Sequence, residues 1–312
     1  MITVLCITGP TASGKSNLAL EFCRKIKSLK PEIISIDSAQ IYRHIDIASA
    51  KPTISERVEI PHHLVDICDP SEQYSVARFI TDANAALTKI ISNGGIPIFV
   101  GGTMMYLYRF IRGISCIPDI PLKVRRLVTE EGRKIGWEKL HKRLVAIDPM
   151  FAGKISVNDT QRIIRGIEVW HHTGKTLTYW KQRKAAVNKH NNHSFKLKMV
   201  ALVPKNKTDL HKKIKSRFNR MVEDGLLCEI VELRGRNLSF KNSSARLVGV
   251  RQAWEFLEGH VSFNEFLWHG ETATRRLAKH QLTWLNKFND VKIIDPYNNS
   301  QSQKISICES LL

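Results

Sequence analysis

Several features are missing from this 312-residue sequence, and each absence excludes a class of protein. No run of about eighteen apolar residues exists, so we expect no membrane-spanning helix. The first residues lead directly into a predicted strand, which leaves no room for a signal or transit peptide. The six cysteines are scattered without a C-x-x-C pair, so we expect reduced thiols rather than disulfides or a zinc site. Together these absences favour a cytoplasmic globular protein.

Acidic residues are scarce in one part of the chain only. Residues 1–116 contain 12 Lys/Arg and 10 Asp/Glu, whereas residues 117–312 contain 36 and 19. In residues 181–220, 13 basic residues accompany a single acid, Asp209. A local imbalance of this kind indicates a polyanionic partner rather than an ordinary solvated surface. An anionic membrane is the rival, but the stretch shows no helix with aromatic residues opposite its lysines. The charge therefore favours nucleic acid.

The most informative motif is a glycine-rich loop that fits G-x-x-x-x-G-K-[ST] without a mismatch. Its residues are Gly9, Pro10, Thr11, Ala12, Ser13, Gly14, Lys15 and Ser16. An apolar, β-branched segment precedes the loop and a helical pattern follows it, which is the required context. Backbone N–H groups of such a loop form an anion site at the helix N-terminus, where Lys15 adds a charge and Ser16 can ligate Mg²⁺. The loop predicts binding of a polyphosphate group.

Strands and helices alternate through the first hundred residues, which predicts an α/β fold with a parallel P-loop sheet flanked by helices. Thr8, Asp37 and Thr103 each follow a predicted strand, so they should lie at the carboxyl edge of the sheet, where ligands bind. The spacing leaves three roles open for Asp37: a helix cap, a Mg²⁺ ligand or a general base. A ribose-binding role in a dinucleotide fold is excluded, because the loop carries G-K-S and not G-x-G-x-x-G.

The chain changes character after Gly113, where prolines mark a break. We expect four segments: the first part of the α/β core, a helical insertion domain, a return to the core with basic helices, and a weakly patterned tail, at residues 1–116, 117–196, 197–295 and 296–312. Within them we expect a polar loop at 185–196 and strands at 199–203 and 291–294.

Two predicted helices carry polar residues of interest. One runs from a cap at Asn158 to Thr173, with Ile163, Ile167 and Trp170 on one face and Gln161, Arg165 and Glu168 facing away. The other spans 208–224, with Thr208 as its cap and an apolar stripe of Leu210, Ile214, Phe218 and Met221. Arg217 falls within that stripe, so its side chain either snorkels to solvent or meets an anion. The phosphate loop elsewhere in the chain favours the anion.

Together these motifs resemble the bacterial tRNA dimethylallyltransferase (tRNA isopentenyltransferase) family, from about residue 3 to 288. The resemblance rests on the phosphate loop and on Asp37-Ser38-Ala39-Gln40-Ile41-Tyr42, Ala50-Lys51-Pro52, Gly101-Gly102-Thr103, Gln161-Arg162-Ile163-Ile164-Arg165, Arg217, Val248-Gly249, Thr274-Arg275 and Lys279 with Gln281. Two positions depart from the family pattern: Val250 replaces a tyrosine and His280 replaces an arginine, both in the part assigned to RNA contact.

The resemblance implies transfer of a dimethylallyl group from its diphosphate to the exocyclic amine of the adenosine 3′ of a tRNA anticodon. The loop would then hold a leaving diphosphate and not ATP, with Mg²⁺ as cofactor. The resemblance assigns catalysis to Asp37 as general base, with Arg217 and Thr11 on the diphosphate. It also implies contacts to the tRNA anticodon stem-loop, in a monomer, from Asp37, Ser38, Ala39, Gln40, Thr103, Arg125, Gln161, Arg162, Ile163, Ile164, Arg165, Arg275 and Lys279.

Three other classes remain open from the sequence. A phosphate-loop kinase or NTPase needs a second Mg²⁺-binding acid, for which only Asp37 and Asp66 are candidates. An enzyme of the same fold that prenylates free adenine nucleotides leaves the net charge of +17 on residues 117–312 without a role. A non-catalytic RNA-binding protein has no need of a G-K-S loop.

Overall fold

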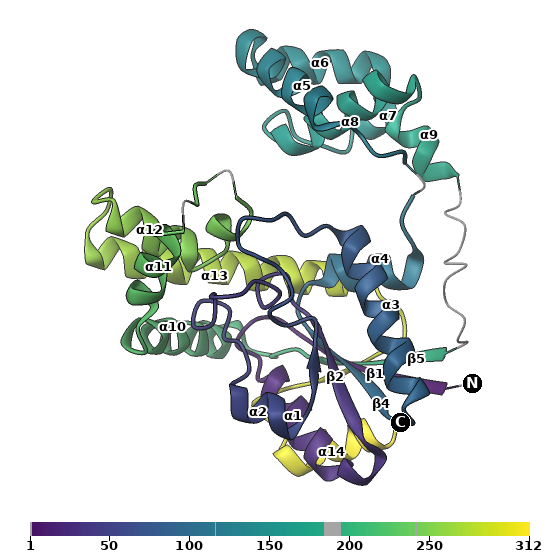
Figure 1. Cartoon of the computed structure of the whole chain (residues 1–312), viewed down its shortest axis with the longest axis vertical. Helices are drawn as coiled ribbons and strands as arrows, with labels where there is room; N and C mark the ends of the chain where they lie inside the picture. Colours follow the sequence, from purple (N-terminus) through teal and green to yellow (C-terminus); the bar gives the residue numbers. More distant parts are fainter. Residues whose placement is uncertain (1, 116, 184–194, 237, 241) are drawn as a thin grey trace. The chain divides into compact units, whose positions relative to one another are not determined.

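The computed structural model describes residues 2–115, 117–183, 195–236, 238–240 and 242–312 (Figure 1). The chain divides into two compact units. Unit 1 comprises Met1–Ile111 and His190–Leu312, and unit 2 comprises Arg112–Lys189. Most of the polar loop predicted at 185–196 lies outside the described residues, and its last two residues already belong to a strand.

Unit 1 is built on a single six-stranded sheet in which every strand pair is parallel. The strand order is β3-β2-β4-β1-β5-β6. The strands are β1 (Ile2–Thr8), β2 (Pro31–Ile36), β3 (His62–His63), β4 (Ile96–Gly101), β5 (Phe195–Leu202) and β6 (Val291–Ile294). The predicted parallel α/β fold is therefore confirmed. β5 and β6 follow the helices of unit 2 in the chain, yet they join the same sheet.

Helices cover both faces of this sheet, as the apolar strands require. In β1, the side chains from Val4 to Ile7 are fully buried. Leu5 and Ile7 pack with α1 (Lys15–Lys25) and α14 (Gln301–Glu309) in one core cluster. On the other face, Phe99 packs against Phe110 of α4 (Met104–Arg112), which also contacts Phe79 of α3 (Val76–Ser92). Figure 1 shows the two pairs of helices on opposite sides of the strands.

The remaining helices of unit 1 are α2 (Ile54–Glu59), α10 (Lys207–Glu223), α11 (Leu226–Arg234), α12 (Val250–Leu257) and α13 (Phe263–Leu285). Side chains of α10 and α13 form a small apolar cluster on which Ala12 of the glycine-rich loop also packs. Asn206 caps α10, because its Oδ1 accepts from the Thr208 N–H at 2.9 Å, so the cap predicted at Thr208 is wrong by two residues.

The C-terminal segment differs from the weakly patterned tail that the sequence suggested. It contains α14, which begins after the capping residue Ser300. Cys308 is fully buried on α14, and Leu311 and Leu312 pack against the core cluster under the sheet. Helical periodicity is weak there because the helix is short and few of its residues face the core.

Unit 2 is helical. It contains α5 (Leu122–Ile135), α6 (Trp137–Ile147), α7 (Pro149–Ala152), α8 (Thr160–Thr173) and α9 (Leu177–Gln182). Asp159 and not Asn158 caps α8, and Gly174 ends it in the left-handed conformation. Ile163 and Ile167 are buried as predicted, but Glu168 is only 1% exposed and does not face solvent. The helical wheel failed at Glu168 because α5 packs against α8 and covers part of the polar face.

Candidate active site

The glycine-rich loop runs from the end of β1 to the start of α1, in the order that the sequence predicted. Its backbone leaves the ordinary regions at Gly9, Ala12 and Gly14, where φ is 148°, 63° and 83°. A Cβ at residue 9 would lie 2.7 Å from the carbonyl oxygen of Leu202 on β5, so only glycine fits there. The loop is therefore pressed against the sheet edge, with the N-terminus of α1 directed at the space beside it.

Two cations lie beside this loop. Lys15 is 9% exposed, and burial lowers the pKa of its ammonium to about 8, opposed by the negative charge of Asp37. Arg217 on α10 is partly buried, and burial lowers its pKa as well, again opposed by Asp37. Among the described residues, neither cation forms an ion pair with a carboxylate. Two desolvated cations without a carboxylate partner are the arrangement expected of an anion site.

Residues far apart in the chain meet at this point. Arg217 Nη1 donates a hydrogen bond to Thr11 Oγ1 at 3.2 Å across a separation of 206 residues. Asp37 follows β2 and is close enough to influence the pKa values of both Lys15 and Arg217. The structure thus brings together the three residues that the resemblance assigned to catalysis, Thr11, Asp37 and Arg217, with Lys15 of the phosphate loop. The arginine predicted to point inward from its helix does so.

Asp37 uses one carboxylate oxygen to shape its own turn. Its Oδ1 accepts from the Ala39 N–H at 2.9 Å, which closes a turn; no helix begins at this point, so the helix-cap role considered from the sequence is wrong. No hydrogen bond to Oδ2 is found in the part of the chain that the structure describes, so this oxygen is available to take a proton. Thr103 lies next to this turn: its Oγ1 accepts from the Ser38 N–H at 3.0 Å and donates to Ser38 Oγ at 3.3 Å. The ends of β2 and β4 are thereby joined at the carboxyl edge.

Thr8, the third residue predicted at this edge, has a structural contact instead. Its Oγ1 donates to the Gly101 carbonyl oxygen at 2.8 Å and is fully buried between β1 and β4. It therefore holds the two strands together and is not accessible to a ligand.

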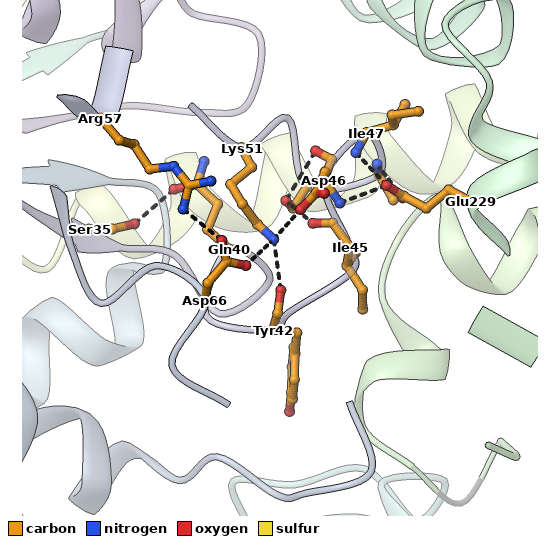
Figure 2. Close-up of polar contacts among 12 residues, drawn as sticks. Ser35, Gln40, Tyr42, Ile45, Asp46, Ile47, Lys51, Arg57, Asp66 and Glu229 are labelled. Carbon is orange, nitrogen blue, oxygen red and sulfur yellow. Dashed lines mark hydrogen bonds and ion pairs between the residues drawn. The ribbon is translucent and has the colours of Figure 1, made fainter. Parts of the chain in front are cut away.

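The segment after Asp37 is fixed by a buried lysine (Figure 2). The Lys51 side chain is 2% exposed, and its Nζ donates to the Tyr42 carbonyl oxygen at 2.9 Å, to Asp66 Oδ1 at 2.5 Å and to Asp46. Arg57 Nη1 donates to the other oxygen of Asp66 at 2.6 Å. Burial raises the pKa of Asp66, but the hydrogen bonds from Lys51 and Arg57 outweigh it and hold the pKa below its usual value. Both oxygens of Asp66 are engaged, so it is a poor candidate for a Mg²⁺ ligand.

A second carboxylate anchors the same segment from α11. Glu229 Oε2 accepts from the N–H groups of Asp46 and Ile47, each at 2.7 Å, and its Oε1 accepts from the Ala48 N–H at 3.0 Å. Figure 2 shows Glu229 reaching this turn from the opposite side to Lys51. The sequence analysis used Ala50-Lys51-Pro52 only as a motif of the family resemblance and missed Glu229, because a glutamate on a helix carries no local signal for contacts 181 to 183 residues away.

The predicted RNA-contacting residues fall on both units. In unit 1, Ser38, Ala39 and Gln40 follow β2, and Arg275 and Lys279 lie on α13. Lys279 is exposed, whereas the Gln40 carboxamide is engaged with Ser35 and with the Ala50 carbonyl oxygen. Gln40 therefore shapes the turn with its side chain and can offer RNA only its remaining surface.

In unit 2, Arg125 of α5 and Arg165 of α8 share one buried carboxylate. Arg165 Nη1 lies 2.7 Å from Glu168 Oε1, and Arg125 Nε lies 4.0 Å from Glu168 Oε2. Gln161 and Arg162 are exposed on the same helix. These four side chains can reach RNA, and Glu168 fixes the orientation of two of them.

Three assignments need correction. Ile163 is fully buried and Ile164 is 8% exposed in the core of unit 2, so their side chains are not available to RNA. They hold α8 in place while the polar residues beside them face outward. Val250 is also fully buried, so its departure from the family pattern alters the packing of α12 rather than an RNA-contacting surface. His280, the other departure, is exposed.

Comparison with known proteins shows the family. A family model described as IPP transferase matches residues 40–288. The chain belongs to this family. It is 32% identical to the tRNA isopentenylpyrophosphate transferase from Bacillus halodurans, with a TM-score of 0.71 and coverage of 100% of this chain and 96% of that one.

Two further solved structures are similar. The tRNA delta(2)-isopentenylpyrophosphate transferase from Staphylococcus epidermidis is 27% identical over 99% of this chain and 98% of that one, with a TM-score of 0.70. A eukaryotic dimethylallyltransferase acting on tRNA is 26% identical over 99% of this chain and 79% of that one, with a TM-score of 0.81. None of the helices in the described residues has the length and apolar character needed to span a membrane.

Proposed function

We propose that this protein transfers a dimethylallyl group from dimethylallyl diphosphate to the exocyclic amine of the adenosine on the 3′ side of a tRNA anticodon. Family membership and the tRNA-directed activities named for its structural relatives support a tRNA prenyltransferase. The observation in this chain that carries the proposal is the pair of buried cations, Lys15 and Arg217, beside Asp37 at the glycine-rich loop.

The chemistry of this reaction matches these residues. The bond between the allylic carbon and the diphosphate oxygen breaks, and the amine nitrogen forms a new bond to that carbon. Charge then builds up on the departing diphosphate, which Lys15, Arg217 and the loop N–H groups stabilise, while the Thr11 hydroxyl orients it. The bond between the allylic carbon and the diphosphate breaks readily because the positive charge that develops on the carbon is delocalised. The amine, in contrast, is a weak nucleophile, because its lone pair is shared with the purine ring.

Asp37 completes the proton balance. As the carbon–nitrogen bond forms, the amine becomes acidic and must lose one proton. The free Oδ2 of Asp37 accepts that proton, while Oδ1 remains bound to the Ala39 N–H and keeps the carboxylate oriented. General base catalysis of this kind contributes about 10²–10⁴-fold in rate.

Magnesium fits the site as a partner of the diphosphate. The described residues contain no group of three or more His, Cys, Asp or Glu side chains that could hold a metal by themselves. The Ser16 hydroxyl is exposed at the start of α1, and Mg²⁺ commonly takes one or two protein ligands while substrate phosphates and water supply the rest. When bound, Mg²⁺ would neutralise charge on the departing phosphate oxygens.

The tRNA would be held by the basic part of the chain. Arg125, Gln161, Arg162 and Arg165 in unit 2 would contact the anticodon stem-loop, as would Arg275 and Lys279 of α13 in unit 1. The target base must leave its stack to reach Asp37, as in other enzymes that modify bases. A tRNA substrate implies a cytoplasmic enzyme. A monomer is part of the proposal.

The kinase or NTPase alternative is not favoured. It requires a second Mg²⁺-binding acid near the loop, and Asp66, one of its two candidates, is held by Lys51 and Arg57. Prenylation of free adenine nucleotides is not favoured either, since that reaction gives the net positive charge of residues 117–312 no role.

Labelled dimethylallyl diphosphate, incubated with unmodified tRNA and Mg²⁺, tests the proposal directly. Label should appear in tRNA, and nucleoside analysis should find it on the amine of one adenosine. A tRNA in which that adenosine is replaced should take up none. Labelling of free adenosine monophosphate but not of tRNA, or ATP turnover without any prenyl transfer, would overturn the proposal.

A further inference from the structure

One glutamine connects the phosphate loop to a distant helix. Gln281 lies near the C-terminal end of α13 and is partly buried. Its Oε1 accepts from the Thr11 N–H at 2.7 Å, and its Nε2 donates to the carbonyl oxygen of Gly102 at 3.0 Å. A backbone N–H can only donate and a carbonyl can only accept, so the two partners fix the orientation of the carboxamide. No other side chain of this length offers one donor and one acceptor in a plane.

Gly102 provides the space that this contact requires. A Cβ at residue 102 would lie 2.4 Å from Gln281 Nε2 and 3.3 Å from Gln281 Cδ. The φ angle of Gly102 is not positive, so the backbone conformation itself does not require glycine there. Glycine is needed at residue 102 because the carboxamide of a residue 179 positions later occupies the place of its side chain.

The hydroxyl and the backbone N–H of Thr11 are therefore both held by the C-terminal half of the chain. Arg217 of α10 binds the hydroxyl, and Gln281 of α13 binds the N–H. The Thr11 N–H is consequently not free to donate to an anion, and the anion is left with the other loop N–H groups. α13 also carries Arg275 and Lys279, two of the residues proposed to contact RNA.

We propose that Gln281 is a positioning residue: its carboxamide clamps the Thr11 backbone to Gly102 and so holds the Thr11 hydroxyl beside Arg217, where the diphosphate binds. This inference rests on the proposed function for the identity of the diphosphate ligand. It assigns Gln281 no contact with substrate. Its effect is to build the diphosphate site from the same helix that carries RNA-contacting residues.

Inorganic pyrophosphate is a suitable probe, because it tests the anion site without tRNA or turnover. Gln281→Met keeps a similar length and removes both hydrogen bonds. Without these bonds the Thr11 backbone is free to leave this position, so we expect pyrophosphate affinity to fall about tenfold by calorimetry, which corresponds to about 1.4 kcal/mol. In prenyl transfer, the KM for dimethylallyl diphosphate should rise by a similar factor, whereas tRNA affinity should stay within about twofold.

A matched control and a second variant keep the test decisive. Gln303 on α14 also accepts a backbone N–H, that of Ser300 at 2.8 Å, but lies outside the site. Gln303→Met should leave pyrophosphate affinity unchanged. Gly102→Ala should displace the Gln281 carboxamide without altering Thr11, and it should reproduce the loss seen in Gln281→Met. If both act through one contact, the double variant should be no worse than the weaker-binding single variant.

The outcomes separate the two proposals. If the wild-type protein fails to prenylate tRNA, the proposed function is wrong, and pyrophosphate affinity alone then decides the role of Gln281. If the wild type is active but Gln281→Met and Gly102→Ala bind pyrophosphate like the wild type, Gln281 is not a positioning residue. A lowered melting temperature with unchanged pyrophosphate affinity and KM would also overturn the inference, since it shows a purely structural contact.

Discussion

Two regions that carry buried charge, the glycine-rich loop of unit 1 and the α5–α8 pair of unit 2, handle it in opposite ways. At the glycine-rich loop of unit 1, Lys15 and Arg217 are desolvated, and in the described residues neither has a carboxylate partner within ion-pair distance. In unit 2, Arg125 and Arg165 already share Glu168, a carboxylate that is nearly inaccessible to solvent.

The difference lies in the counter-charge: the loop cations lack one, whereas the arginines of unit 2 have one. Cations buried without a counter-charge cost stability unless an anion arrives, so the loop is built to bind one strongly. The arginines of unit 2 are already neutralised on one side and keep their outer surface exposed. In the proposed function, they are oriented in advance for weaker, salt-dependent contacts with RNA phosphates.

The largest effect should come from Asp37, the carboxylate whose charge acts on both Lys15 and Arg217. Asp37→Asn keeps an acceptor for the Ala39 N–H but removes the base. We expect turnover to fall by about 10²-fold or more, with tRNA affinity nearly unchanged. Single-turnover transfer at saturating substrate, together with tRNA binding, measures both. Full activity in this variant would reduce Asp37 to a turn cap.

Paired arginine variants sharpen the comparison. Arg217→Ala should cost roughly 2–4 kcal/mol of transition-state stabilisation, measured as kcat/KM for dimethylallyl diphosphate. Arg165→Ala should instead weaken tRNA binding and lower the melting temperature, because it leaves the buried Glu168 with only the distant Arg125. Its kcat at saturating tRNA should change little. If Arg217→Ala lowers only the melting temperature, Arg217 is an ordinary helix arginine and the contrast between the regions fails.

The salt dependence of tRNA affinity tests the RNA-gripping role of the basic part. Replacing Arg125, Arg165 and Arg275 together by Gln should reduce the slope of log affinity against log salt by about two to three. Replacing Lys25, Lys27 and Lys30, which are exposed at the end of α1 and just beyond it, should change the slope little.

A tRNA without the target adenosine provides the control for this measurement. It should show the wild-type slope but give no product, because backbone contacts position the RNA while base contacts specify the site. Equal slopes for the wild type and both triple variants would show that the basic residues form a solvated surface.

The smallest expected effect concerns pH. Burial lowers the pKa of Lys15 from 10.5 to about 8, so the ammonium of the free protein is lost as pH rises through 8. The KM for dimethylallyl diphosphate should therefore rise about fivefold between pH 8 and 9. Lys15→Met should bind dimethylallyl diphosphate weakly, and its KM should show no such rise with pH. From pH 8 to 10.5 Lys15 binds more protons in the unfolded chain than in the folded one. This group therefore raises the free energy of unfolding as pH increases. A flat KM profile in the wild type would contradict a desolvated Lys15.

Local patterns in the sequence were sufficient for the sheet and the loop. Apolar β-branched runs such as Val4–Ile7 form strands wherever they are buried, and the glycine-rich loop between a strand and a helix has few alternatives. The inward direction of Arg217 also followed from helical periodicity, because three apolar neighbours fix which face of α10 is buried.

Only the tertiary structure decided which polar groups meet. The burial of Glu168 depends on α5 covering α8, and the engagement of Asp66 depends on Lys51 and Arg57 reaching it from other turns. Gln281 and Gly102 are joined across 179 residues. Periodicity reports the face on which a side chain lies, but a hydrogen bond depends on distances of a few tenths of an ångström, which the packing of whole elements sets. The sequence by itself therefore determined the architecture and predicted the kind of ligand, and long-range packing determined the partners of each charge.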